Sequence, residues 1–124
     1  MPARLRPADP AVASAALGRF RAGTVDADDL RLLTKHLLAL LVARAPGSAV
    51  EVRVPPYAAA QCVGGTRHTR GTPPAVVETD PVTWVSLGVG DLAWADALAD
   101  GSLSATGERA DLSALLPLEG RPGP

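Results

Sequence analysis

The chain has 124 residues, a formal net charge of −1 and a single cysteine, Cys62. This length is typical of one domain, and the near-zero charge argues against a protein that binds nucleic acid through its phosphates. One cysteine excludes an internal disulfide and favours a reducing compartment. No apolar signal segment precedes Asp9, and the longest apolar run, residues 37–43, is too short to span a bilayer. We therefore expect a cytoplasmic protein without a transmembrane segment.

The first part of the chain is predicted to be helical. Residues 1–8 contain two prolines and are expected to be flexible. Asp9 and Pro10 then predict a helix to about residue 21, because aspartate caps the first free amides and proline fits the first turn. A second helix begins after Asp26 or Thr24. Its leucines recur at helical spacing, at positions 30, 33, 37 and 41.

The period then changes to alternation, which predicts strands. Valines at 50, 52 and 54 alternate with charged residues, as in a half-buried strand. The prolines at 55 and 56 interrupt this strand or remove it from the ladder, and residues 57–63 are expected to continue as a second strand segment. A Gly-Gly turn at 64–65 would return the chain antiparallel over residues 66–72. Residues 75–79 are predicted to form another short strand.

Two short helices are predicted next. Asp80 and Pro81 repeat the helix start at residues 9–10, and this helix, which ends near Gly88, carries Trp84 and Leu87 on one face. Asp91 is expected to cap the following helix, which ends near a glycine at 101. In this helix, we expect the interior to receive the side chains of Trp94, Ala97 and Leu98.

The C-terminal part is predicted to finish the domain. Residues 103–106 form a final strand, and a last helical turn begins near residue 111. Leucines at 115, 116 and 118 close the core. We expect one domain over residues 9–118 and a flexible tail over 119–124.

The most polar stretch is the run 67–74 (RHTRGTPP), between the Gly-Gly turn and a Pro-Pro pair. Arginine and threonine side chains can grip a carboxylate or a phosphate. The alternative is a solvated hairpin tip whose charges pair locally, for example with Glu78.

Catalytic and metal sites are not supported by the sequence. The histidines at 36 and 68 and the one thiol lack the paired spacing of a zinc site, and we expect neither a metal nor a cofactor. A Cys62–His68 pair across the hairpin would lack the third, orienting group of a catalytic triad. The GVGDLA string at 88–93 follows a predicted helix, whereas a dinucleotide-binding motif follows a strand.

Several segments together resemble the bacterial orthologue branch of the sterol carrier protein 2 family. They are residues 51–57 (EVRVPPY), 61–63 (QCV), 67–74 (RHTRGTPP), 77–84 (VETDPVTW), 92–98 and 107–118. The resemblance covers about half to two-thirds of the chain. It implies an α+β fold, with a mainly antiparallel sheet of about five strands covered by helices and two N-terminal helices. It also implies a hydrophobic tunnel between sheet and helices for sterols, fatty acids or acyl-CoA.

Two departures from the family bear on the ligand. The chain lacks the long apolar C-terminal helix that closes the tunnel in eukaryotic carriers, and its tail carries no peroxisomal address. A related domain occurs in mycothiol-dependent isomerases, but their metal-binding helical bundle is absent here. Sterol itself is therefore a less favoured ligand than other lipids.

The leading hypothesis is a non-catalytic carrier, a monomer or weak homodimer, that binds a lipid or acyl-CoA and no nucleic acid. Arg67, His68 and Arg70 would hold an anionic head group. The apolar walls of the cavity would be Val52, Val54, Trp84, Leu87, Trp94, Leu98 and Leu103. The alternatives are a protein-interaction module with a filled core that uses the polar hairpin 67–74, or an accessory domain to a mycothiol-dependent enzyme.

Overall fold

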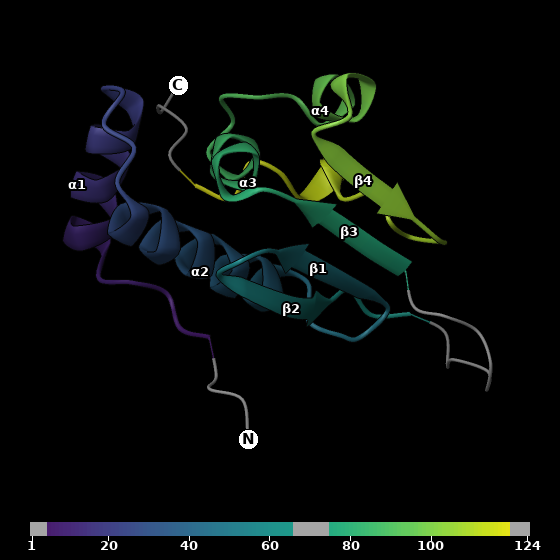
Figure 1. The fold of residues 1–124 in the computed structure, drawn as a ribbon. Helices are drawn as coiled ribbons and strands as arrows, with labels where there is room; N and C mark the ends of the chain where they lie inside the picture. The colour runs from purple at the N-terminus through teal and green to yellow at the C-terminus, as the bar shows by residue number, and fades with distance from the viewer. Residues whose placement is uncertain (1–4, 66–74, 120–124) are drawn as a thin grey trace.

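The computed structural model describes residues 5–65 and 75–119, which form an α+β domain (Figure 1). Two helices, α1 (Pro10–Arg21) and α2 (Ala27–Arg44), precede the strands β1 (Val50–Val54), β2 (Ala58–Cys62) and β3 (Ala75–Thr79). The chain then forms α3 (Pro81–Gly88), α4 (Trp94–Asp100), β4 (Leu103–Thr106) and a short 3-10 helix, Ser113–Leu115.

Three of the helices begin at an aspartate, as predicted. The carboxylate of Asp9 accepts hydrogen bonds from the first amides of α1, Asp26 does so for α2, and Asp80 accepts from the Thr83 amide of α3. Proline occupies the first turn of α1 and of α3. These caps satisfy amides that have no partner inside the helix, so they set the start of each helix locally.

The predicted cap of α4 is wrong. This helix begins at Trp94, its N-cap is Ala93, and no side chain caps it. The Asp91 amide instead bonds to the Ser86 carbonyl in the turn that closes α3, and the Asp91 carboxylate pairs with Arg21 of α1 at 3.0 Å. A long-range ion pair therefore holds the side chain that local sequence assigned to a cap.

The sheet has the strand order β2-β1-β3-β4 within the described residues. Strands β1 and β2 are antiparallel, as are β3 and β4, whereas β1 and β3 run parallel at the centre. The prolines at 55 and 56 form the turn that folds β2 back onto β1, so they do not remove β1 from the ladder. The strand expected over residues 66–72 lies outside the described residues.

The core lies on one side of the sheet, under the helices. Helix α2 packs against α1, α3 and β2, and α4 packs against β4 (Figure 1). The side chains at alternate positions of β1 and β3 face these helices and are buried, while those between them face the other side. We call these the inner and outer faces of the sheet. Their separation follows from the period of two in a strand.

Candidate functional site

Six of the predicted ligand-binding side chains lie in one buried apolar cluster beneath the helices. None of them is more than 8% exposed. They come from β1, α3, α4 and β4 and belong to the same core as the leucines of α2. They are Val52, Val54, Trp84, Leu87, Trp94 and Leu103. The sequence pattern therefore identified correctly which side chains share the interior, although their contact with a ligand stays a prediction.

Helix α3 approaches α2 closely at this cluster. The indole Nε1 of Trp84 donates a hydrogen bond to the carbonyl of Thr34 on α2, at 3.2 Å. A Cβ added at Gly88 would lie 2.8 Å from Cδ1 of Leu37, so the bare glycine backbone permits this contact between the helices. The indole satisfies its only polar group inside the core, as a buried tryptophan normally does.

A buried hydroxyl at Thr34 was missed by the sequence analysis. Thr34 is fully buried, and its Oγ1 atom has no hydrogen-bond partner among the described residues. An unsatisfied hydroxyl of this kind costs about 1–3 kcal/mol in an apolar interior. In the sequence, Thr34 comes four residues after Leu30 and three before Leu37, and this spacing places it on the buried face of α2. The described core thus contains a buried hydroxyl without a partner, on the residue whose backbone carbonyl accepts from the Trp84 indole.

The expectation that Leu98 faces inward is wrong, because this side chain is 42% exposed. Helix α4 has seven residues, and its buried residues are Trp94 and Ala97. Leu98 lies about 100° around the helix from Ala97, on the solvent side of this narrow contact with β4. Because α4 is short, it buries fewer side chains than the spacing of Trp94, Ala97 and Leu98 in the sequence had predicted.

The predicted head-group ligands Arg67, His68 and Arg70 lie outside the described residues. Their expected grip on an anion therefore stays a prediction. Glu78, the partner considered for this run, is exposed on the outer face.

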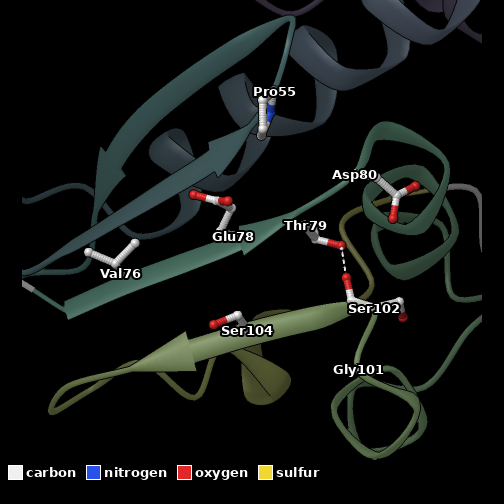
Figure 2. A pocket seen from close by; sticks show the side chains of 8 residues that line it. All are labelled: Pro55, Val76, Glu78, Thr79, Asp80, Gly101, Ser102 and Ser104. Carbon is white, nitrogen blue, oxygen red and sulfur yellow. Dashed lines mark hydrogen bonds between the residues drawn. The ribbon is translucent and has the colours of Figure 1, made fainter.

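The outer face carries two hollows on either side of Pro55. The larger, of about 550 Å³, is lined by β3, β4 and the turns that flank α3 and α4 (Figure 2). The smaller, of about 380 Å³, is lined by the β1–β2 turn and includes Arg53, Tyr57 and Glu78. These hollows open on the face opposite the apolar cluster.

The larger hollow is rich in oxygen atoms that accept hydrogen bonds. Glu78 lies on β3 and Ser104 on the neighbouring edge strand β4, and Ser102 lies just before β4 begins (Figure 2). Thr79 Oγ1 donates to the Ser102 carbonyl at 2.7 Å, and the Asp80 carboxylate is engaged by Thr83 in the cap of α3. Pro55 and Val76 add apolar surface to these oxygen atoms, so the lining of this hollow is mixed in character.

The interior thiol is not poised for nucleophilic chemistry. Cys62 is fully buried on β2. Burial raises the pKa of this thiol to about 11. The thiolate is the reactive form, so Cys62 is almost entirely unreactive at neutral pH. His68, its expected partner, lies outside the described residues.

The histidine on α2 is buried and fully engaged. His36 is 3% exposed and contacts the Ala8 amide and the Glu119 carboxylate. In the part of the chain that the structure describes, no group of three or more His, Cys, Asp or Glu side chains could hold a metal ion.

These observations define the class of protein as an α+β domain in which helices enclose an apolar interior against one face of a mixed sheet. The family described as bacterial SCP ortholog matches residues 26–118, from the cap of α2 to Leu118. The chain therefore belongs to this bacterial branch of the sterol carrier protein family. A search of curated proteins found no match. Among the described helices, none combines the length and the apolar character needed to cross a membrane.

Proposed function

We propose that the protein is a non-catalytic carrier that binds an amphipathic lipid, such as a fatty acid or acyl-CoA, between the helices and the inner face of the sheet. The family supports a carrier fold. The proposed contact residues come from β1 (Val52, Val54), α3 (Trp84, Leu87), α4 (Trp94) and β4 (Leu103). The head group would reach Arg67, His68 and Arg70.

The observation that carries this proposal is the free hydroxyl of Thr34. It is buried and lacks a partner among the described residues, and the backbone carbonyl of the same residue accepts from the Trp84 indole. A second polar group of the ligand besides its head group, such as a hydroxyl on the chain or the thioester of an acyl-CoA, would satisfy it and remove the cost of leaving it unpaired. The interior therefore favours a ligand that carries both an apolar chain and a polar group over a pure hydrocarbon.

The lining is closed, so a ligand must displace protein side chains. Helix α4 is the element best suited to move, because it is short, lacks a side-chain cap and buries only Trp94 and Ala97 along its length. Elements with few buried contacts open at the lowest free energy. Movement of α4 away from β4 would uncover Trp94 and Leu103 and admit an alkyl chain.

The experiment is a titration of delipidated protein with fatty acids and acyl-CoA, followed by native mass spectrometry and by tryptophan fluorescence. Trp84 and Trp94 are the only tryptophans, so the fluorescence reports on the proposed interior. Thr34→Val keeps the side-chain shape and removes the hydroxyl. We expect it to weaken binding of lipids with polar groups by about tenfold, the effect of about 1.4 kcal/mol.

The matched control is Ser104→Val, which makes a similar change in the outer hollow and should leave affinity unchanged. Absence of any complex at lipid concentrations of about 100 µM, at which a site with a dissociation constant of about 1 µM would be almost fully occupied, would contradict the proposal. Equal effects of the two variants would place the ligand elsewhere.

A second candidate, a protein-interaction module with a filled core, is favoured by the closed lining of the interior. Val52, Val54 and Trp84 have no exposed area, as in a solid core. This module would act through the polar run 67–74. A partner lost on Arg70→Ala, in a protein that binds no lipid, would select this function.

A further inference from the structure

The buried imidazole of His36 joins three separate parts of the chain. His36 lies in the middle of α2 and is 3% exposed. Its Nδ1 atom accepts a hydrogen bond from the Ala8 amide at 2.9 Å. Its Nε2 atom lies 2.6 Å from Oε1 of Glu119. The imidazole thus connects α2 to the segment before α1 and to the segment after the 3-10 helix.

These contacts determine the protonation state of the ring. A backbone amide can only donate, so Nδ1 must be the unprotonated, accepting nitrogen. The proton of the neutral ring therefore lies on Nε2 and is donated to the Glu119 carboxylate. The observed arrangement requires neutral imidazole, in a single tautomer.

Both connected segments cover the core. Leu5 of the N-terminal segment packs against the core. Leu118 of the C-terminal segment is buried, and its amide and that of Glu119 both donate to the carbonyl of Gly88 at the end of α3. Arg44 of α2 donates to the carbonyls of Leu115, Pro117 and Leu118. The C-terminal segment therefore has several anchors besides His36. The N-terminal segment, by contrast, is joined to α2 by the hydrogen bond from the Ala8 amide to His36.

We propose that His36 is a pH-sensitive clasp that releases the N-terminal segment, residues 5–8, when the ring is protonated. Protonation places an N–H group on Nδ1, directly opposite the N–H group of Ala8, so an attractive contact becomes a contact between two donors. On the other side of the ring, the bond from Nε2 to Glu119 becomes an ion pair and is kept. The two ends of the chain therefore respond differently to the same proton.

Of the charged groups near the clasp, Lys35 and Arg6 are exposed at the surface. Asp29 on α2 pairs with Arg19 of α1 at 2.8 Å. Arg44 holds the C-terminal carbonyls. Asp9, next to the clasp, accepts from the first amides of α1. Glu119 is thus the charged group in hydrogen-bond contact with the ring among the described residues.

The test is a pH titration of the ¹⁵N-labelled full chain by NMR between pH 7.5 and pH 5, a range that brackets the ordinary histidine value of about 6.5. Imidazole ¹⁵N shifts should show the Nε2–H tautomer at the upper end. As the ring protonates, we expect the Ala8 amide signal to move and its protection from hydrogen exchange to fall by about fivefold or more. The amides of Leu118 and Glu119 should keep their protection.

Three results would overturn the clasp. The first is a ring that stays neutral throughout this range. The second is a ring that protonates while Ala8 remains protected. The third is loss of all protected amides together, which would show global unfolding and not local release.

His36→Asn is the matched variant, because its side-chain oxygen can accept from Ala8 at the position of Nδ1 but does not titrate. In this variant the protection of Ala8 should no longer depend on pH. Glu119→Gln is a second variant, which removes the carboxylate and keeps the histidine. In it, release of Ala8 should occur at lower pH than in the unmodified chain, because the protonated ring has lost its anionic partner. Unchanged release in both variants would also contradict the proposal.

Discussion

On β1, Val52 faces the helices and is fully buried, whereas its neighbour Arg53 faces the opposite side of the sheet and is exposed. The same contrast separates Val77 from Glu78 on β3. The inner face is therefore apolar and closed, while the outer face is polar and hollowed on both sides of Pro55. The same strands thus offer two surfaces suited to different ligands.

Because of this difference, a ligand would have to bind the outer face and the inner face in different ways. A ligand on the outer face would enter an existing hollow lined by both hydrogen-bonding and apolar groups. A lipid at the inner face would instead have to open the packing of Trp84, Trp94 and their neighbours, and in return its chain would be removed from water. A carrier built on this fold should therefore combine a stable inner face with one element, α4, that can open.

The largest expected effect tests the packing of the helices over the inner face, at the large buried side chain Trp84 of α3. Trp84→Ala removes a fully buried indole and its hydrogen bond to Thr34. We expect the free energy of unfolding to fall by about 3–5 kcal/mol, the usual cost of emptying such a site. Urea denaturation followed by circular dichroism measures this loss. Trp84→Phe should cost clearly less, and a loss below about 1 kcal/mol for the alanine variant would show that the inner face is not tightly packed.

A matched pair on β3 sharpens the comparison between the faces. Val77→Ser places a hydroxyl in the apolar core and should lower the free energy of unfolding by about 3 kcal/mol, from lost burial and an unpaired polar group. Glu78→Ser changes the next residue, which is exposed in the outer hollow, and should alter stability by no more than about 0.5 kcal/mol. Thermal denaturation of both variants provides the measurement. Similar losses would mean that the outer face is also covered.

Most of this framework could be predicted because it depends on local chemistry. The aspartates at 9, 26 and 80 accept from amides two or three residues later, so each helix start is encoded in a few neighbouring residues. The alternation in β1 and β3 identified their inner face in the same way. Membership of the family, expected from short motifs, is confirmed over residues 26–118.

The remaining features depend on contacts between distant residues. Asp91 resembles a cap in sequence, but it pairs with Arg21, which is 70 residues away. His36 and Glu119 are 83 residues apart, and nothing near either of them in sequence indicates their contact. The parallel pairing of β1 with β3 and the free hydroxyl of Thr34 likewise depend on how the elements pack. The polar run 67–74, on which much of the functional hypothesis rested, lies outside the described residues.

The smallest expected effect concerns Cys62, which faces the core from β2 opposite Val50. Burial raises the pKa of its thiol from 9.0 to about 11, so the folded state resists deprotonation. The contribution of the protonated Cys62 thiol to the free energy of unfolding is therefore fully present below pH 9. It is lost as the pH rises to about 11, because the unfolded chain releases this proton first. The loss should reach about 2 kcal/mol or less.

The measurement is the difference in free energy of unfolding between the unmodified chain and Cys62→Ala, from urea titrations at pH 8 and above. Taking the difference removes the contributions of lysine and tyrosine groups that also titrate there. If the difference does not change with pH, water reaches the thiol and the inner face is open at β2. In that case a lipid could enter beside β2 without movement of α4, and the contrast between a closed and a hollowed face would hold only for the β3 side of the sheet.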